Sequence, residues 1–125
     1  MRIASLDHLV LTVADVRETV AFYERLGMRL EVFGDNRLAL RFGRQKLNLH
    51  QAGQERTPHA GVTRPGSADL CFLIEGELEA AERELRAAQV QIELGPVERA
   101  GAEGAIRSLY LRDPDGNLVE ISEAI

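Results

Sequence analysis

The hydrophobic and polar positions of the 125-residue chain form one succession of patterns that occurs twice. In the first half, apolar and polar residues alternate, then follow helical spacing, then alternate again in three short runs separated by turn residues. These patterns predict a strand over 3–13, a helix over 14–28, and strands over 29–33, 37–42 and 46–50. Asp15 is expected to cap the helix at its start, and Gly27 stands where its end should lie.

The second half repeats this order after a connector rich in Gly, Pro and polar residues. It predicts a strand over 69–74, a helix over 77–90, and strands over 91–98, 105–112 and 117–122. The fold class is therefore α+β, with two βαβββ modules. We expect one domain, in which module one covers 1–51, a linker covers 52–68 and module two covers 69–125.

Alternation along the predicted strands gives each module an apolar face and a mixed polar face. In the strand over 46–50, Lys46, Asn48 and His50 share the side opposite Leu47 and Leu49. A polar face of this kind is either solvent-exposed surface or the wall of a site.

The duplication suggests which polar residues belong to a site, because equivalent positions in two like modules occupy symmetric places. His8 and Asp69 open the first strands of their modules, and His50 and Glu120 lie near the ends of the last strands. These four residues are potential metal ligands in two pairs of equivalent positions. Asp69 has an alternative explanation, since its side chain could bond its own backbone in a turn.

Composition excludes several classes of function. The net charge of −5 disfavours nucleic acid as a partner, because basic and acidic residues are interspersed. The single cysteine, Cys71, cannot form an internal disulfide, and we expect it to act as a small buried hydrophobe in a reducing compartment. No apolar run is long enough to span a bilayer and no signal peptide is evident, so we expect a cytoplasmic protein with no membrane partner.

Several stretches resemble one known family. They are "LDHLVLTV" at the start, "FYERLGM" after the first predicted helix, "KLNLHQAG", "PGSADLCFL" and "YLRDPDGNLVEI" near the end. Together with the paired modules, they are similar to the vicinal-oxygen-chelate superfamily, which includes glyoxalase I, fosfomycin-resistance thiol transferases, ring-cleavage dioxygenases and bleomycin-binding proteins. The similarity is greatest to small glyoxalase domain-containing proteins of the lactoylglutathione lyase type.

The resemblance implies a fold and a metal site. In this superfamily the sheets of two modules curl into a cup with the helices on its outer face, and the first and last strands of each module supply the ligands. Carried onto this chain, the ligands are His8, His50, Glu120 and Asp69, of which Asp69 is the least secure. Two imidazoles and a carboxylate suit one divalent ion, with Ni, Zn, Mn and Fe left open. By the same resemblance His50 stands in the place of a glyoxalase glutamate.

The resemblance also implies an activity. The expected function is that of a metal-dependent glyoxalase-I-like lyase acting on the adduct of a 2-oxoaldehyde with a thiol such as glutathione, and Glu120 is the expected catalytic carboxylate. A fosfomycin-type thiol transferase and a ring-cleavage dioxygenase are alternatives on the same metal site. A metal-free drug-binding protein of the bleomycin-resistance type is an alternative of another class. A small-molecule substrate and a homodimer are expected in addition, with Asn48, Arg37, Arg41 and Tyr110 as candidate substrate contacts.

Overall fold

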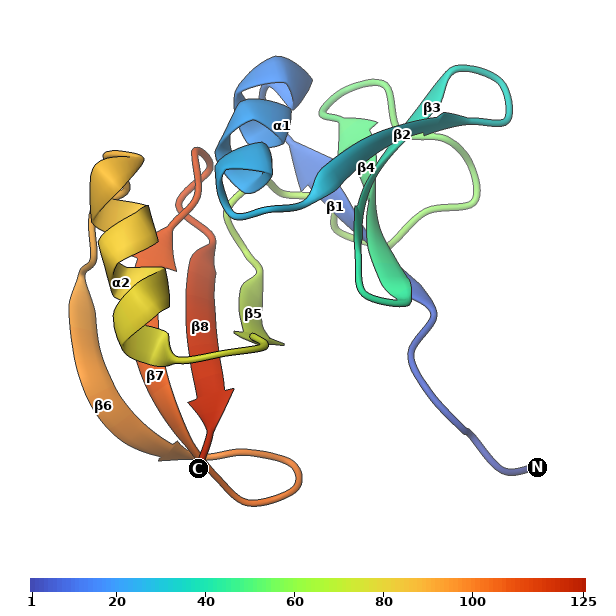
Figure 1. Cartoon of the computed structure of the whole chain (residues 1–125). Helices are drawn as coiled ribbons and strands as arrows, with labels where there is room; N and C mark the ends of the chain where they lie inside the picture. The colour runs from blue at the N-terminus through green and yellow to red at the C-terminus, as the bar shows by residue number, and fades with distance from the viewer. The chain divides into compact units, whose positions relative to one another are not determined.

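The two halves of the computed structural model repeat one order of elements, a strand, a helix and three strands (Figure 1). The structure describes all 125 residues and divides into two compact units, Met1–Gly66 and Ser67–Ile125, which are described separately. The division falls within the segment expected to be a linker. No helix in either unit is long and apolar enough to cross a membrane.

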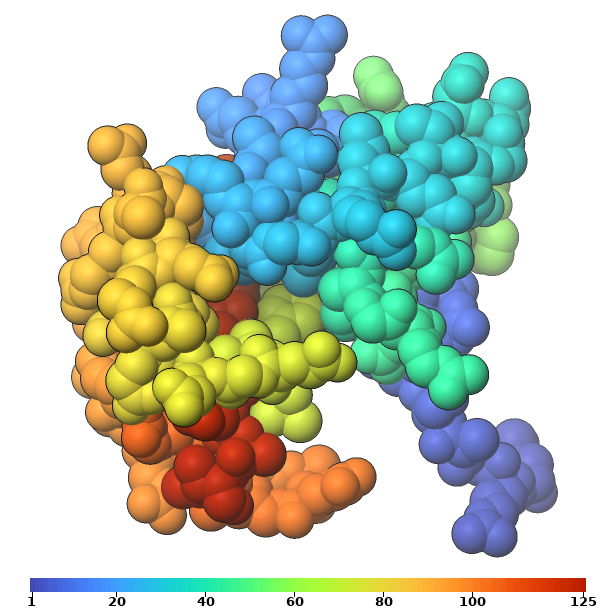
Figure 2. Space-filling view, in the orientation of Figure 1, coloured from blue at the N-terminus to red at the C-terminus, as the bar shows by residue number.

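The first unit holds one helix and a four-stranded mixed sheet. Its elements are β1 (His8–Val13), α1 (Val16–Arg25), β2 (Arg29–Phe33), β3 (Arg37–Phe42) and β4 (Gln45–Gln51). The strands lie in the order β1-β4-β3-β2, with β1 parallel to β4 and the other neighbours antiparallel. The first seven residues form no element and extend away from this sheet (dark blue in Figures 1 and 2).

Helix α1 begins and ends where its sequence signals predict. The Asp15 side chain accepts hydrogen bonds from the backbone N–H groups of Arg17 and Glu18, which lack partners inside the helix. Gly27 follows the helix with a φ of +93°, a conformation that costs glycine little. The helix buries Phe22 and Tyr23, whose rings meet edge to face with centroids 5.1 Å apart.

The second unit has the same architecture. Its elements are β5 (Asp69–Leu73), α2 (Leu78–Ala87), β6 (Leu94–Ala100), β7 (Ala105–Arg112) and β8 (Leu118–Ala124). The strands lie in the order β5-β8-β7-β6, with β5 parallel to β8. Leu78 and Leu85 of α2 are buried, as are Leu109 and Leu111 of β7. The predicted α+β class and both βαβββ modules are confirmed.

The turn between β7 and β8 also holds the start of the second unit. One carboxylate oxygen of Asp113 accepts hydrogen bonds from the backbone N–H groups of Asp115 and Asn117. The Asn117 side chain donates to the other oxygen of Asp113 and accepts from the Ala68 backbone N–H at 2.8 Å. This Asp-Asn pair is almost completely buried, and it brings the residue before β5 beside the start of β8.

The first strand, β1, begins at His8 rather than at 3, because pairing with β4 starts only there. A second difference from the predicted elements is the start of β6. It begins at Leu94 rather than at 91, and its pairing with β7 shifts register between Leu94 and Val97. Gly95 lies in this irregular stretch with a φ of +119°. A Cβ at Gly95 would lie 2.4 Å from the Ser108 carbonyl oxygen, so this position requires glycine.

Replacing Gly95 with alanine should destabilise the second unit strongly. We expect Gly95→Ala to lower the free energy of unfolding by about 2 kcal/mol or more, because the methyl group clashes with the β7 backbone and φ is unfavourable. Urea denaturation followed by circular dichroism would measure this change. Gly61→Ala is the matched control, since a Cβ there meets no atom within 4 Å. Equal stability of the two variants would contradict the close approach at Gly95.

Candidate functional site

The polar face of the second sheet carries a row of three functional side chains. Strand pairing places Cys71 of β5 opposite Glu120 of β8, and Glu120 opposite Tyr110 of β7. Paired residues point to the same side of a sheet, so the three side chains line up across it. The polar face predicted from alternation is therefore present, with Glu120 in the middle of the row.

One buried hydroxyl group holds the Glu120 carboxylate, and a second one lies beside it. Ser108 Oγ donates a short hydrogen bond to Glu120 Oε2, and Ser122 Oγ lies 3.4 Å from the same oxygen. Both serines are completely buried, and their Oγ atoms lie 2.7 Å apart. Because both contacts go to Oε2, the other carboxylate oxygen, Oε1, remains available for a substrate or an ion.

The number of available protons decides which group donates in each hydrogen bond of this cluster. A hydroxyl has a single proton, and that of Ser108 is donated to Glu120, so Ser122 is the donor in the Ser122–Ser108 bond. Ser122 must then accept from the Cys71 thiol, whose sulfur lies 3.3 Å away. Burial of the sulfur raises the pKa of Cys71, and the nearby negative charge of Glu120 raises it further, so the thiol keeps its proton.

The position of Cys71 differs from the expectation of a buried small hydrophobe. The residue is exposed, and only its sulfur is drawn into the serine cluster. Cys71 lies on the polar face of β5, which is an edge strand of its sheet.

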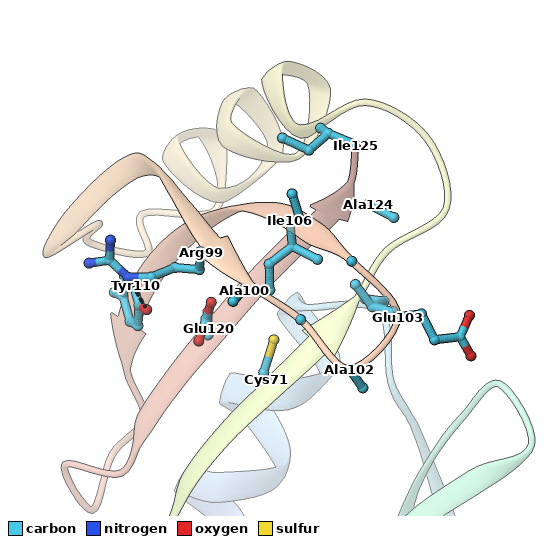
Figure 3. Close-up of a pocket in the computed structure, with 14 residues that line it drawn as sticks. Cys71, Arg99, Ala100, Ala102, Glu103, Ile106, Tyr110, Glu120, Ala124 and Ile125 are labelled. Atoms are coloured by element: carbon cyan, nitrogen blue, oxygen red, sulfur yellow. Dashed lines mark hydrogen bonds between the residues drawn. The ribbon is translucent and has the colours of Figure 1, made fainter.

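A pocket of about 640 Å³ opens beside Glu120 (Figure 3). Glu120 and Cys71 lie in its middle, while Arg99 and Tyr110 lie together at one end. The loop from 101 to 104 and the end of β8 form the rest of the wall. Aliphatic side chains line that wall, including Leu73, Ile106, Ala124 and Ile125. The volume lies in the range of small-molecule sites.

Tyr110 is bonded to a side chain that the sequence did not single out. Arg99 Nε donates to the Tyr110 hydroxyl at 3.0 Å, and the guanidinium carbon lies 5.5 Å from the centre of the tyrosine ring. Arg99 comes from β6, whose irregular register could not be derived from alternation. Arg99 could therefore be placed in the pocket only from the observed pairing of β6 with β7.

In the first unit, strand register changes the expected equivalence of the modules. Asn48 pairs with Val10, two residues after His8, just as Glu120 pairs with Cys71, two residues after Asp69. The counterpart of Glu120 is therefore Asn48, and that of His50, which pairs with Thr12, is Ser122. Counting along the chain had placed His50 opposite Glu120, which is wrong by two residues.

His8 and His50 lie on the same face of the first sheet but at opposite ends. His8 pairs with Lys46, four residues before His50 on β4, which corresponds to about 13 Å along the sheet. The structure does not bring these two predicted ligands together. Neither unit by itself gathers three or more His, Cys, Asp or Glu side chains in a metal-binding arrangement.

His8 nevertheless has the environment of an oriented ligand. Its Nδ1 lies 2.8 Å from Asp7 Oδ1, and the side chain is exposed on the open face of the sheet. A carboxylate bonded to one ring nitrogen fixes the imidazole and leaves Nε2 as a donor atom for a metal. This bond also lowers the pKa of Asp7 below its usual range. Asp69, the least secure of the predicted ligands, is exposed at the start of β5.

His50 and Asn48 are buried polar residues with unpaired atoms. Both ring nitrogens of His50 and the Asn48 side-chain oxygen lack hydrogen-bond partners, although the residues are only 8% and 4% exposed. Burial lowers the pKa of His50, with a further contribution from the charge of Arg37, so the imidazole is held neutral. Unpaired buried groups are costly, and such sites are candidates for ligand contacts.

The other predicted contacts of the first unit are already engaged. Arg41 Nε forms a 2.7 Å ion pair with Glu31 Oε2. Arg37 and Lys46 both lie over the Phe33 ring, the Lys46 nitrogen 3.7 Å from its centre. The ion pair with Glu31 reduces the capacity of Arg41 to bind an anion. The positive charge of Arg37 acts on His50 and contributes to its lowered pKa.

The buried, neutral state of His50 makes stability depend on pH. The unfolded chain takes up a proton at His50 near its ordinary pKa of 6.5, whereas the folded chain resists protonation, so acid favours unfolding. We expect the unfolding free energy of the metal-free protein to fall between about pH 7.5 and 5.5, and His50→Gln to reduce that fall by up to about 1 kcal/mol. Urea denaturation at both pH values would measure it. His59→Gln, at an exposed histidine whose charge contributes less to the His50 pKa than burial and Arg37 do, should leave most of the pH dependence in place; the same effect in both variants would contradict this explanation.

Comparison with known proteins agrees with this geometry. The model of the Glyoxalase/Bleomycin resistance protein/Dioxygenase superfamily matches residues 5–121. Glyoxalase domain-containing protein RDO1 of Mycosarcoma maydis is 51% identical over 122 residues, which cover 98% of this chain and 69% of that protein. Virulence protein STM3117 of Salmonella typhimurium is 51% identical over 126 residues, covering 100% of this chain and 88% of that protein.

Solved structures give the same result. The crystal structure of STM3117 superposes with a TM-score of 0.98 and covers 100% of both chains. An integron cassette protein from the mobile metagenome of V. cholerae is 54% identical, with a TM-score of 0.97 over 100% of this chain and 98% of that chain. The chain belongs to the glyoxalase, bleomycin-resistance and dioxygenase superfamily, as its paired modules and motifs predicted.

Proposed function

We propose that this chain is a metal-dependent lyase of the glyoxalase I type, which isomerises the adduct of a 2-oxoaldehyde with a thiol. One observation carries the proposal above all others. Glu120 stands in the middle of a small-molecule pocket, with one carboxylate oxygen held by a buried serine and the other available. A positioned carboxylate beside a space for substrate is what a proton transfer between adjacent carbons requires.

In the proposed reaction Glu120 is the base. Its carboxylate removes the proton from the carbon that bears the hydroxyl and the thiol, and the released electron pair forms an enediolate with the neighbouring carbonyl. The same carboxyl group returns the proton to the neighbouring carbon, while the hydroxyl proton moves to the neighbouring oxygen, which gives a 2-hydroxy thioester. Ser108 keeps the carboxylate in one orientation throughout, because its hydroxyl donates to the oxygen that does not transfer the proton.

The reaction also needs stabilisation of the enediolate charge. A divalent ion, when bound, supplies Lewis-acid polarisation of two adjacent substrate oxygens. His8 and Glu120 are the donors that we propose for it, because each is oriented by a neighbour and keeps one donor atom available. Asp69 stays a predicted ligand of the same ion, whereas His50, about 13 Å along the sheet from His8, is too far away to share it.

The relatives support the proposal in general terms. One of the curated relatives, RDO1, is named as a glyoxalase domain-containing protein. The thiol-transfer and ring-cleavage alternatives would use the same metal and Glu120, while the drug-binding alternative needs no metal. Metal content and isomerase activity together distinguish these three outcomes.

Two substitutions test the proposal. Protein produced with Ni, Zn, Mn or Fe should hold close to one ion per chain and convert the hemithioacetal of methylglyoxal and glutathione to the thioester. His8→Ala should lower the metal content measured by mass spectrometry, since the oriented imidazole is lost. Glu120→Gln should lower kcat by about 100-fold or more, because the base is lost.

Glu103→Gln is the matched control, since Glu103 lines the same pocket but points away from it (Figure 3). Its metal content and turnover should equal those of the unchanged protein. Absence of turnover with all four metals would reject the glyoxalase function. A bound metal without isomerisation would favour the thiol-transfer or ring-cleavage alternatives, and absence of metal would favour the drug-binding alternative.

A further inference from the structure

We infer that the Arg99–Tyr110 end of the pocket binds a carboxylate, so that the natural substrate is a short aliphatic acid carrying two adjacent oxygen atoms. This inference rests on the proposed function for the role of Glu120. It departs from that function in the substrate, because a short acid takes the place of the glutathione adduct while Glu120 keeps its role as the base.

The hydrogen bonds at this end leave two donors free. The Tyr110 oxygen accepts from Arg99 Nε, so its own proton is available, and the structure contains no acceptor for that proton. A second Arg99 nitrogen donates to the backbone carbonyl of Glu98, which leaves the third without a partner. A phenol O–H and a guanidinium N–H side by side match the two oxygens of a carboxylate.

The charges at this end also favour an anion. Arg99 forms no ion pair, whereas Arg86, Arg107 and Arg112 of the same unit are bonded to Glu82, Glu79 and Glu93. Arg99 is the only basic residue that lines the pocket. The guanidinium therefore has no carboxylate partner within its unit, and a ligand could supply one.

The place of Glu120 limits the size of the acid. Tyr110 and Glu120 are cross-strand neighbours, whose Cβ atoms lie about 5 Å apart in such pairs. Tyr110 lies at one end of the pocket and Glu120 in its middle, so a carboxylate held at Tyr110 directs the rest of a short ligand toward Glu120 (Figure 3). Repulsion from Glu120 keeps the carboxylate at the Arg99 end.

The remaining wall of the pocket accounts for the aliphatic part of the ligand. Ile106, Ala124 and Ile125 offer apolar side chains. Glutathione, by contrast, carries two carboxylates and an ammonium group, for which this pocket provides a single guanidinium. A short oxo acid or hydroxy acid fits the distribution of charge better.

A binding experiment on the metal-free protein tests this inference without requiring turnover. Sodium 2-oxobutanoate, its methyl ester and glutathione would each be titrated into the full chain after chelation, with amide resonances and calorimetry as readouts. We expect the acid to bind and to shift the amide resonances of Arg99 and Tyr110. The neutral ester should bind more weakly by a factor of about ten or more.

Three variants identify the residues involved. Arg99→Gln should weaken binding of the acid by about 10- to 100-fold, and Tyr110→Phe by several-fold, because each removes a donor to the carboxylate. Arg112→Gln is the matched control, since that arginine is bonded to Glu93, and it should bind the acid as the unchanged protein does.

The inference is overturned if the acid does not bind at millimolar concentration, if acid and ester bind equally, or if Arg99→Gln has no effect. It is also overturned if glutathione, and not the short acid, depends on Arg99. These outcomes are independent of the proposed function. Methylglyoxal isomerisation that survives Arg99→Gln would support the glyoxalase activity without the acid site, and acid binding by a protein that never isomerises the hemithioacetal would do the reverse.

Discussion

The parallel pairing of the first and last strands of each module is the constraint on which the other features of the site depend. It joins residues far apart in sequence, such as Cys71 and Glu120, and aligns their side chains on one face. The helix between them covers the opposite, apolar face, so the paired face is left for polar groups. Capping by Asp15 and the Asp113–Asn117 turn contribute to this arrangement, because each fixes a chain segment next to one of the paired strands.

The polar face of the second sheet combines two properties that rarely occur together at a surface. Ser108 and Ser122 are completely buried, yet they form a hydrogen-bonded cluster in which each proton has a partner. Such a cluster holds a carboxylate rigidly, since any rotation of Glu120 would leave a buried hydroxyl without an acceptor. In the first unit, by contrast, His50 and Asn48 are buried, and both ring nitrogens of His50 and the side-chain oxygen of Asn48 have no hydrogen-bond partner.

Much of the fold follows from alternation and turn residues. The two βαβββ modules, the capped first helix and the separation of polar from apolar faces were predicted from local patterns, because side chains in a strand alternate whatever the partner strand. The β6 strand was placed less well, since Gly95 and its irregular pairing interrupt the alternation. The match of Asn48 to Glu120 was missed for a related reason. Counting residues from one module to the next depends on loop lengths, whereas register depends on hydrogen bonds between strands.

The sequence by itself determined the fold class, the family and the identity of Glu120 as a residue on a polar face, because periodicity and local motifs are properties of neighbouring residues. Only the tertiary structure decided that Ser108, Ser122 and Cys71 form one directed cluster with Glu120, that Arg99 lies against Tyr110, and that His8 and His50 lie at opposite ends of their sheet. These relations join residues from different strands. The physical reason is that strand register and the shift beside Gly95, which set which side chains meet, are fixed by packing across the whole unit.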